Sequence, residues 1–217
     1  MTKLALFDCD GTLVDGQGAV CAAMETAFAS VEAAPPPRPV IRRIVGLSLP
    51  QAVARLAPGL PPTTQERIVA AYRHAFRSAR EAGTIKEPLF DGIAALLDAL
   101  RAAGWLLGVA TGKSDRGLEA CLAAHGLRGH FITLQTADRH PSKPDPAMLH
   151  AAMRDVDAQP ATTVMIGDTV FDIAAARVAG VRAFGVAWGY HAASELMEAG
   201  AEMVAETPAE LELMLNG

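Results

Sequence analysis

Two aspartates one residue apart, Asp8 and Asp10, stand where the apolar run 4–7 gives way to a turn at Gly11. Buried strands of parallel sheets are nearly continuous apolar runs, and these sheets keep their chemistry at the carboxyl ends of the strands. Two anions this close repel each other unless a cation lies between them. Carboxylate and carbonyl oxygens suit Mg²⁺ better than zinc, so the pair predicts a site for magnesium and phosphate.

Two further stretches carry groups that suit phosphate. Thr111 and Gly112 follow the apolar run 105–110 and precede a helix start, where a hydroxyl and free N–H groups can bind phosphate oxygens. Lys143 stands in the segment Ser-Lys-Pro-Asp-Pro, in which two prolines restrict the backbone. Its ammonium would offset the charge of Asp8 and of a phosphate oxygen.

A second pair of acids, Asp168 and Asp172, follows the apolar run 162–166. If a helix begins near Thr169, the two acids lie one turn apart and can face the same point. Each motif alone also has a structural explanation, as a turn residue, a helix cap or an acid that favours the helix dipole. Polar groups of the required kinds at three strand ends favour one shared site.

The apolar runs alternate with helical patterns, which predicts an α/β fold with a doubly wound parallel sheet. The expected strands are 4–7, 105–110, 162–166 and 181–187. The expected helices are 91–103, 115–125, 146–155, 169–179 and 207–215.

The long interval between the first two strands breaks this alternation. Residues 16–87 contain no convincing strand and consist of Ala-rich helical segments separated by Pro and Gly clusters. This interval is far too long for an ordinary connection between a strand and a helix. We therefore expect a Rossmann-like core of residues 1–15 and 88–217 and an inserted helical cap of residues 16–87.

The composition bounds the class of protein. The chain has 217 residues, 51% of them hydrophobic, which is ample for a buried core. A net charge of -5 disfavours a nucleic-acid partner, and a small phosphorylated metabolite is the more natural one. Three scattered cysteines indicate neither a disulfide framework nor a zinc site. Without a signal-peptide pattern or a membrane-length apolar segment, we expect a cytoplasmic protein with no membrane partner.

The order of the motifs resembles the haloacid dehalogenase superfamily of phosphohydrolases. The chain reads Asp-Cys-Asp-Gly-Thr at 8–12, Thr111 after a strand, Lys143-Pro144, and Gly-Asp-x-x-x-Asp at 167–172. The helical interval is similar to the branch with an α-helical cap, which includes phosphoglycolate phosphatases, pyrophosphatases and β-phosphoglucomutases. Trp-Gly-Tyr at 188–190 is similar to phosphoglycolate phosphatase-like members.

The resemblance implies a Mg²⁺-dependent phosphatase that works through an aspartyl phosphate. Asp8 would be the nucleophile, Asp10 the general acid and base, and Thr111 and Lys143 the remaining catalytic groups. The phosphate-binding set would be Asp8, Cys9, Asp10, Gly11, Thr111, Gly112 and Lys143. The metal-binding set would be Asp8, Asp10, Asp168 and Asp172.

Several alternatives stay open at this point. In the cap, Arg43 and Gly46 are candidate substrate contacts that could reach a carboxylate or a second phosphate. The acceptor could be a sugar hydroxyl, as in a phosphotransferase of the β-phosphoglucomutase type, or the substrate could be pyrophosphate. A dehalogenase is disfavoured because that chemistry needs no leaving-group acid at Asp10. A monomer and a homodimer are equally compatible with the sequence.

Overall fold

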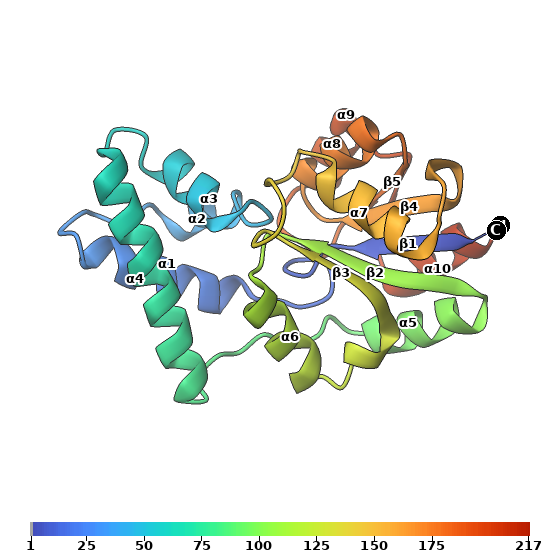
Figure 1. The fold of residues 1–217 in the computed structure, drawn as a ribbon, viewed down its shortest axis with the longest axis horizontal. Helices are drawn as coiled ribbons and strands as arrows, with labels where there is room; N and C mark the ends of the chain where they lie inside the picture. The colour runs from blue at the N-terminus through green and yellow to red at the C-terminus, as the bar shows by residue number, and fades with distance from the viewer. Residues whose placement is uncertain (1) are drawn as a thin grey trace.

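The fold is built on one parallel sheet of six strands in the order β3-β2-β1-β4-β5-β6, described by a computed structural model for residues 2–217 (Figure 1). The strands are β1 (Lys3–Phe7), β2 (Trp105–Thr111), β3 (Phe131–Thr136), β4 (Thr163–Gly167), β5 (Arg182–Val186) and β6 (Met203–Ala205). The expected α/β class, the parallel sheet and all four expected strands are confirmed. Two strands, β3 and β6, were not predicted.

Helices connect the strands and cover both faces of the sheet. Those of the core are α5 (Ile93–Ala102), α6 (Asp115–Ala124), α7 (Ala147–Val156), α8 (Val170–Ala179), α9 (Ala193–Ala199) and α10 (Pro208–Asn216). Two short 3₁₀ turns, Arg128–His130 and Pro160–Thr162, precede β3 and β4. The expected helices are present within a few residues at each end, and α9 is the one that the sequence analysis missed.

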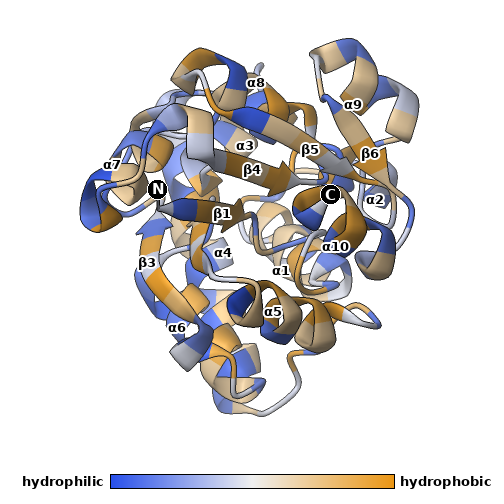
Figure 2. Ribbon diagram, turned by 90° about the vertical axis from the view of Figure 1, so that its right-hand side faces the viewer, coloured by the Kyte–Doolittle hydropathy of each residue, from blue (hydrophilic) through white to orange (hydrophobic). Residues whose placement is uncertain are grey.

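The core lies on the two sides of the sheet. One cluster of buried side chains joins the sheet to α5, α6 and α10, and a second joins it to α7, α8 and α9. Figure 2 shows the apolar strands between these two layers of helices. Because both faces are covered, β1, β2, β4 and β5 are apolar along most of their length, which made these four strands recognisable from sequence.

Between β1 and α5 lies a helical insert, which we define as residues 16–87. It contains α1 (Gln17–Ala29), α2 (Arg38–Arg42), α3 (Leu49–Leu56) and α4 (Pro62–Glu81). These helices share a hydrophobic cluster of their own, centred on Met24, Ile41 and Ile68, and they lie to one side of the sheet (Figure 1). Within residues 2–217 no helix is both long enough and apolar enough to span a membrane. The domain boundaries at 15/16 and 87/88 stay a prediction.

The strand order decides which residues can meet. β1 is central and pairs in parallel with β2 on one side and β4 on the other. Phe7 lies beside Val109 and Ile166, so the residues that follow these three strands emerge at the same edge of the sheet.

Candidate active site

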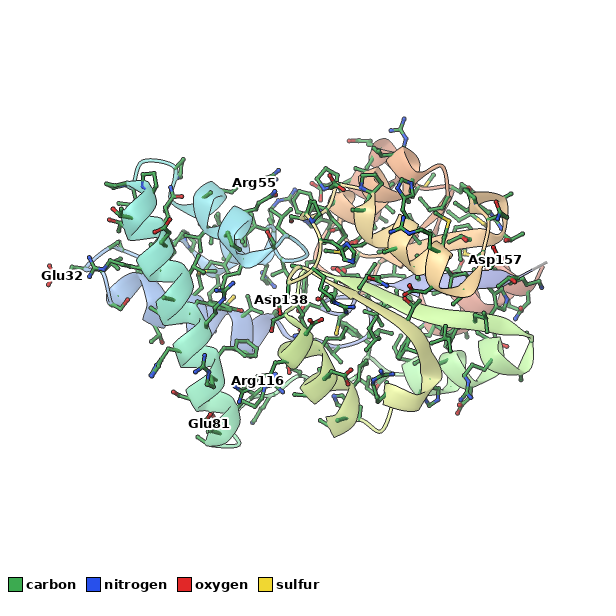
Figure 3. The ribbon with its side chains drawn as sticks, in the orientation of Figure 1. Glu32, Arg55, Glu81, Arg116, Asp138 and Asp157 are labelled. Carbon is green, nitrogen blue, oxygen red and sulfur yellow. The ribbon has the colours of Figure 1, made fainter. Side chains whose placement is uncertain are left out.

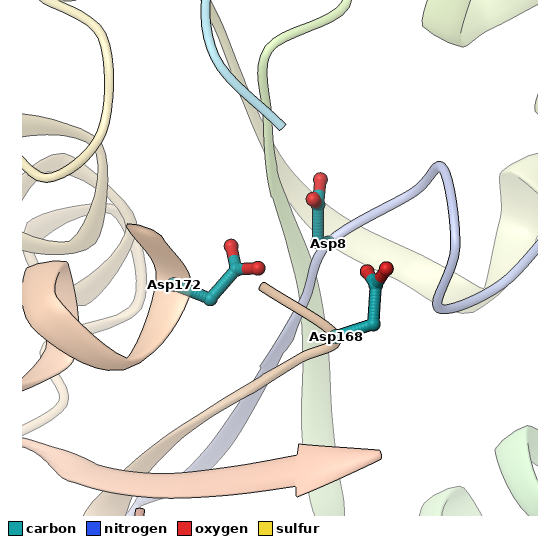
Figure 4. Close-up of side chains that lie close together, drawn as sticks. All are labelled: Asp8, Asp168 and Asp172. Atoms are coloured by element: carbon teal, nitrogen blue, oxygen red, sulfur yellow. The ribbon is translucent and has the colours of Figure 1, made fainter. Parts of the chain in front are cut away.

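Three acids from two neighbouring strand ends converge at this edge. Asp8 follows β1 and is anchored by its backbone N–H, which donates to Ile166 O at 2.9 Å. Asp168 follows β4, and Asp172 lies in the first turn of α8. One carboxylate oxygen from each of Asp8, Asp168 and Asp172 lies within 4.8 Å of the others (Figure 4). The expected turn of helix between Asp168 and Asp172 is what brings both acids to Asp8.

The carboxylate of Asp8 is buried and only partly bonded. Its Oδ1 accepts a hydrogen bond of 2.7 Å from the N–H of Cys9. Its Oδ2 lies 3.0 Å from Nζ of Lys143 but accepts no hydrogen bond of normal geometry from residues 2–217. Burial raises the pKa of Asp8 to about 7, Lys143 opposes this shift, and the charge of Asp172 adds to it. The carboxylate therefore has an oxygen free to bind a cation or attack a substrate.

Lys143 is completely buried among anions. Its Nζ donates to Oδ1 of Asp172 at 2.6 Å and to the carbonyl oxygen of Ala110 at 3.1 Å. Burial would lower the pKa of Lys143, but Asp172 and Asp8 raise it above its ordinary value. The other oxygen of Asp172 accepts from the N–H and the hydroxyl of Thr169, at 3.1 and 2.6 Å. Both oxygens of Asp172 thus already have protein partners, and its clearest structural task is to hold Lys143.

Asp168 is held by groups from two loops. Its Oδ1 accepts from the hydroxyl of Thr12 at 2.9 Å, and its Oδ2 accepts from the N–H of Tyr190 at 2.9 Å. A Cβ on Gly11 or on Gly189 would lie 2.1 Å from an atom of the Asp168 side chain. Burial raises the pKa of Asp168 well above its ordinary value, and the charges of Asp172 and Asp8 add to the shift. The two glycines let both loops close around this carboxylate.

These donors fit a hard divalent cation. The cluster is made of oxygen atoms alone, it is buried, and Oδ2 of Asp8 accepts no hydrogen bond from the described residues 2–217. Among residues 2–217, these three acids are paired with one ammonium, that of Lys143, which leaves an excess of negative charge. Oxygen-only coordination with surplus negative charge suits Mg²⁺.

Some of the phosphate-binding candidates line the cavity above Asp8, and Cys9 does not. Thr111 is buried at the end of β2, and both Thr111 and Gly112 line the cavity above Asp8. The side chain of Cys9 points away from the cavity, and its sulfur lies 4.0 Å from that of Cys121 in the core. The backbone N–H of Cys9 donates a hydrogen bond to Asp8, so the contact of Cys9 with the site is made by its backbone and not by its side chain.

A cavity of about 430 Å³ opens above these residues, between the sheet edge and the helical insert. Its floor includes Asp8 and Asp10, and one wall is the stripe Tyr72, Arg73, Phe76, Arg77 and Arg80 on a single face of α4. On the core side it is lined by Arg116 and Asp138, which are labelled beside α6 in Figure 3. A volume in this range is typical of small-molecule sites.

The helical insert reaches the site through the loop that precedes α3. Gly46 lines the cavity, and a Cβ on it would lie 3.6 Å from Oδ2 of Asp8. The N–H of Ser48 donates to the hydroxyl of Ser142 at 2.7 Å, directly before Lys143. The predicted substrate contact Gly46 is thus near the site.

The other predicted contact of the insert, Arg43, lies elsewhere. Its guanidinium forms an ion pair with Glu195 of α9, and it does not line the cavity. Its backbone oxygen is 3.0 Å from Nε2 of His191. Arg43 therefore links the insert to the core, because its guanidinium is paired with an acid of α9.

Three groups of the site were not singled out from the sequence. They are Lys113, Glu87 and the arginines of α4 that line the cavity. Lysine is scarce in this chain, with four residues against fifteen arginines, and Lys113 directly follows Thr111-Gly112. That position was the available signal for Lys113, whereas nothing local marks Glu87 as its partner.

Comparison with known proteins gives consistent results. A family described as haloacid dehalogenase-like hydrolase matches residues 5–186. Probable phosphatase IndB of Dickeya dadantii (strain 3937) is 36% identical over 215 residues, covering 97% of this chain and 92% of that protein. Phosphoglycolate phosphatase of Vibrio vulnificus (strain YJ016) is 29% identical over 214 residues, covering 96% and 94%. A hydrolase from Pseudomonas syringae superposes with a TM-score of 0.86 at 26% identity, covering 99% and 98% of the two chains.

Proposed function

The chain belongs to the haloacid dehalogenase-like hydrolases, and we propose that it is a Mg²⁺-dependent phosphatase that hydrolyses small phosphate monoesters through an aspartyl phosphate on Asp8. The observation that carries the proposal is the environment of Asp8. In the part of the chain that the structure describes, one oxygen of its buried carboxylate has no hydrogen bond and lies 3.0 Å from Lys143, at the floor of a cavity of small-molecule size. A free carboxylate oxygen beside a fixed cation suits nucleophilic attack on a phosphorus atom.

In the first step, a carboxylate oxygen of Asp8 attacks phosphorus and the bond between phosphorus and the leaving oxygen breaks. Asp10 gives its proton to that oxygen, so the product departs as an alcohol. Burial raises the pKa of Asp10 above its ordinary value, although Lys113 opposes the shift, and this favours a protonated carboxyl at the start. Lys143, the hydroxyl of Thr111 and the N–H groups around Gly112 would stabilise the phosphoryl oxygens as charge shifts.

In the second step, the carboxylate of Asp10 takes a proton from water as the water oxygen attacks phosphorus. The bond between phosphorus and Asp8 breaks, which releases inorganic phosphate and restores both acids to their starting forms. Splitting the hydrolysis in this way replaces one difficult displacement with two easier ones.

The metal would be held by Asp8, by Asp168 and by the backbone carbonyl of Asp10, with Asp172 close by. When bound, Mg²⁺ would neutralise part of the negative charge of the acids and of the phosphate. The protein itself supplies the dry surroundings and the fixed positions of these oxygens, since Asp8, Asp168 and Asp172 are all fully buried.

The cavity indicates the kind of leaving group. Arg73 and Arg77 line it, and within residues 2–217 no carboxylate lies within ion-pair distance of either guanidinium. Tyr72 and Phe76 lie on the same face of α4, with ring centroids 5.7 Å apart. We therefore propose an organic phosphate whose leaving group has an apolar part against these rings and a carboxylate or second phosphate toward the arginines.

A panel of phosphate esters tests the proposal. Inorganic phosphate release is measured with Mg²⁺ and again after chelation, for alkyl phosphates with and without a terminal carboxylate or phosphate. We expect release that depends on the metal and is at least tenfold faster for the esters with the second anion. If no ester or pyrophosphate releases phosphate but a sugar hydroxyl accepts the phosphoryl group, the enzyme is a phosphotransferase instead.

A further inference from the structure

Lys113 is a buried lysine for which the mechanism above has no direct task. Its Nζ lies 2.6 Å from Oε1 of Glu87 and 3.0 Å from Oδ1 of Asp10, and its side chain is only 8% exposed. Burial would lower the pKa of Lys113, but Asp10 and Glu87 are among the groups that raise it well above its ordinary value. Lys113 is therefore a fixed cation beside the proposed proton donor.

The arrangement around Lys113 repeats the one around Lys143. In the part of the chain that the structure describes, these are the two lysines that form ion pairs with buried acids. Lys143 contacts Asp8 and is held on its other side by Asp172. Lys113 contacts Asp10 and is held on its other side by Glu87. Asp8 and Asp10 thus each contact a different lysine, and each of these lysines is held in place by a second acid.

Glu87 is itself well anchored. Its Oε2 accepts a hydrogen bond of 3.1 Å from Arg80 of α4, and its carbonyl oxygen lies 2.7 Å from Nε2 of His125. The ring of Phe76 covers both cations, 5.7 Å from Nζ of Lys113 and 5.6 Å from the guanidinium of Arg80. Because Glu87 is bonded on both sides, it holds Lys113 in one place.

Asp10 is confined from the opposite side as well. A Cβ on Gly16 would lie 2.2 Å from Oδ1 of Asp10, so this oxygen packs directly against the backbone of Gly16. The same oxygen is buried and accepts no hydrogen bond of normal geometry from residues 2–217. Its position is therefore set by contact with Gly16 and by the charge of Lys113.

We infer that Lys113, fixed by Glu87, is a positioning residue that orients the carboxyl of Asp10 toward the leaving oxygen of the substrate. The inference rests on the proposed function, because it assigns Lys113 to the proton transfer by Asp10. Both Lys113 and Asp10 line the cavity, so the carboxyl is held at its surface and not in the core.

The test uses two substrates that differ in their need for a proton donor. The leaving group of p-nitrophenyl phosphate is a stable phenolate, whereas 2-glycerol phosphate must release an alkoxide. The comparison uses kcat/KM, which reports the transfer of the phosphoryl group to Asp8 and leaves out the later hydrolysis, in which Asp10 serves both substrates alike. We expect Lys113→Met to lower kcat/KM for 2-glycerol phosphate by roughly 10- to 100-fold, part of the roughly 100- to 10,000-fold that general acid catalysis contributes, and kcat/KM for p-nitrophenyl phosphate by less than about threefold. Lys113→Arg should restore part of the lost rate because it keeps the charge.

Two other variants sharpen the comparison. In Glu87→Gln the new side chain has nearly the shape of the old one but no charge. We expect a loss that again affects 2-glycerol phosphate more than p-nitrophenyl phosphate, although it is smaller than in Lys113→Met. Lys86→Met is the matched control, since Lys86 is exposed and neighbours Glu87 in the same linker, and it should change neither rate. Equal losses for both substrates in Lys113→Met and Glu87→Gln would overturn the inference and leave Lys113 a structural ion.

A crystal structure of Lys113→Met gives an answer that does not depend on turnover. The inference requires the Asp10 carboxyl to leave the place it holds beside Gly16, and an unchanged Asp10 would refute it. Failure of the proposed function would give a different result, because then the unmodified protein would release phosphate from neither ester.

Discussion

Lys143 and Asp172 form an ion pair at the centre of the candidate site, with 2.6 Å between Nζ and Oδ1, and both side chains are fully buried. Asp172 is fixed in turn by Thr169, whose N–H and hydroxyl both donate to its Oδ2. Asp172 lies in the first turn of α8 and binds Lys143, which in turn contacts Asp8. The position of α8 therefore helps to determine where Lys143 and the carboxylate of Asp8 lie.

Removal of this lysine tests its electrostatic role. We expect Lys143→Ala to lower kcat by at least roughly 100-fold, in line with the loss of one preorganised charge that stabilises the transition state. The variant also leaves Asp8 and Asp172 without their cation, so its unfolding temperature in the absence of metal should fall. Steady-state rates below that temperature decide the matter, with Lys86→Ala as the exposed control. A rate within threefold of the unmodified protein would show that another group does this task.

The nucleophile is tested by an isosteric change. Asp8→Asn should abolish turnover while the fold is retained, because the amide cannot attack phosphorus but occupies the same volume. Since burial raises the pKa of Asp8 to about 7, a neutral group is already tolerated at this position. The measurement is phosphate release with saturating Mg²⁺, together with circular dichroism. A variant that keeps even a tenth of the rate would count against Asp8 as the nucleophile.

The core of this site could be predicted because it depends on two simple regularities. Continuous apolar runs mark buried parallel strands, and the residues after them share one edge of the sheet. This was enough to bring Asp8 and Asp168 together from positions far apart in the sequence. The pair Asp168 and Asp172 needed only the spacing of one helical turn.

The features that were missed depend on tertiary contacts. β3 lies at an edge of the sheet, and its polar residues Thr133 and Gln135 are buried and form hydrogen bonds with Asp155 of α7. Nothing in the strand itself shows that a partner exists. Likewise, Lys113 meets Glu87 only because the linker after α4 returns to the core, where Pro88 and Phe90 form backbone hydrogen bonds with Asp15 and Leu13.

The packing of the insert on the core gives a third prediction. A Cβ on Gly112 would lie 2.4 Å from the carbonyl oxygen of Leu47 and 2.8 Å from that of Gly46. Gly112→Ala should therefore push the insert loop away from Asp8 and lower kcat/KM by at least tenfold, since a misplacement of about 1 Å can cost roughly 100-fold. The matched control is Gly129→Ala, because among residues 2–217, its two chain neighbours aside, no atom lies within 4 Å of a Cβ built at Gly129. Equal rates for the two variants would show that this contact does not matter for catalysis.

The last prediction concerns how the stability of the fold depends on pH, first without a metal and then with Mg²⁺ bound to the acids. Burial raises the pKa of Asp8 from 3.8 to about 7, and it also raises the pKa values of Asp10 and Asp168. Between about pH 4 and pH 7 the folded protein therefore binds more protons at these acids than the unfolded chain, so their contribution to the free energy of unfolding falls as pH rises. Mg²⁺ binds the deprotonated carboxylates and should offset this loss, more strongly near pH 7 than near pH 5.

The measurement is the unfolding temperature at several pH values, in chelator and in millimolar Mg²⁺, for the unmodified protein and for Asp8→Asn. In chelator we expect the unmodified protein to lose stability relative to Asp8→Asn as pH rises from about 5 to 7, because the variant lacks the titrating group. Burial lowers the pKa of His140, which acts in the opposite direction, but His140 is present in both proteins and cancels in the comparison. The stabilisation by Mg²⁺ should be smaller in Asp8→Asn, since one ligand has lost its charge. Parallel pH curves for the two proteins, with equal shifts on adding Mg²⁺, would show that Asp8 neither titrates in this range nor binds the metal.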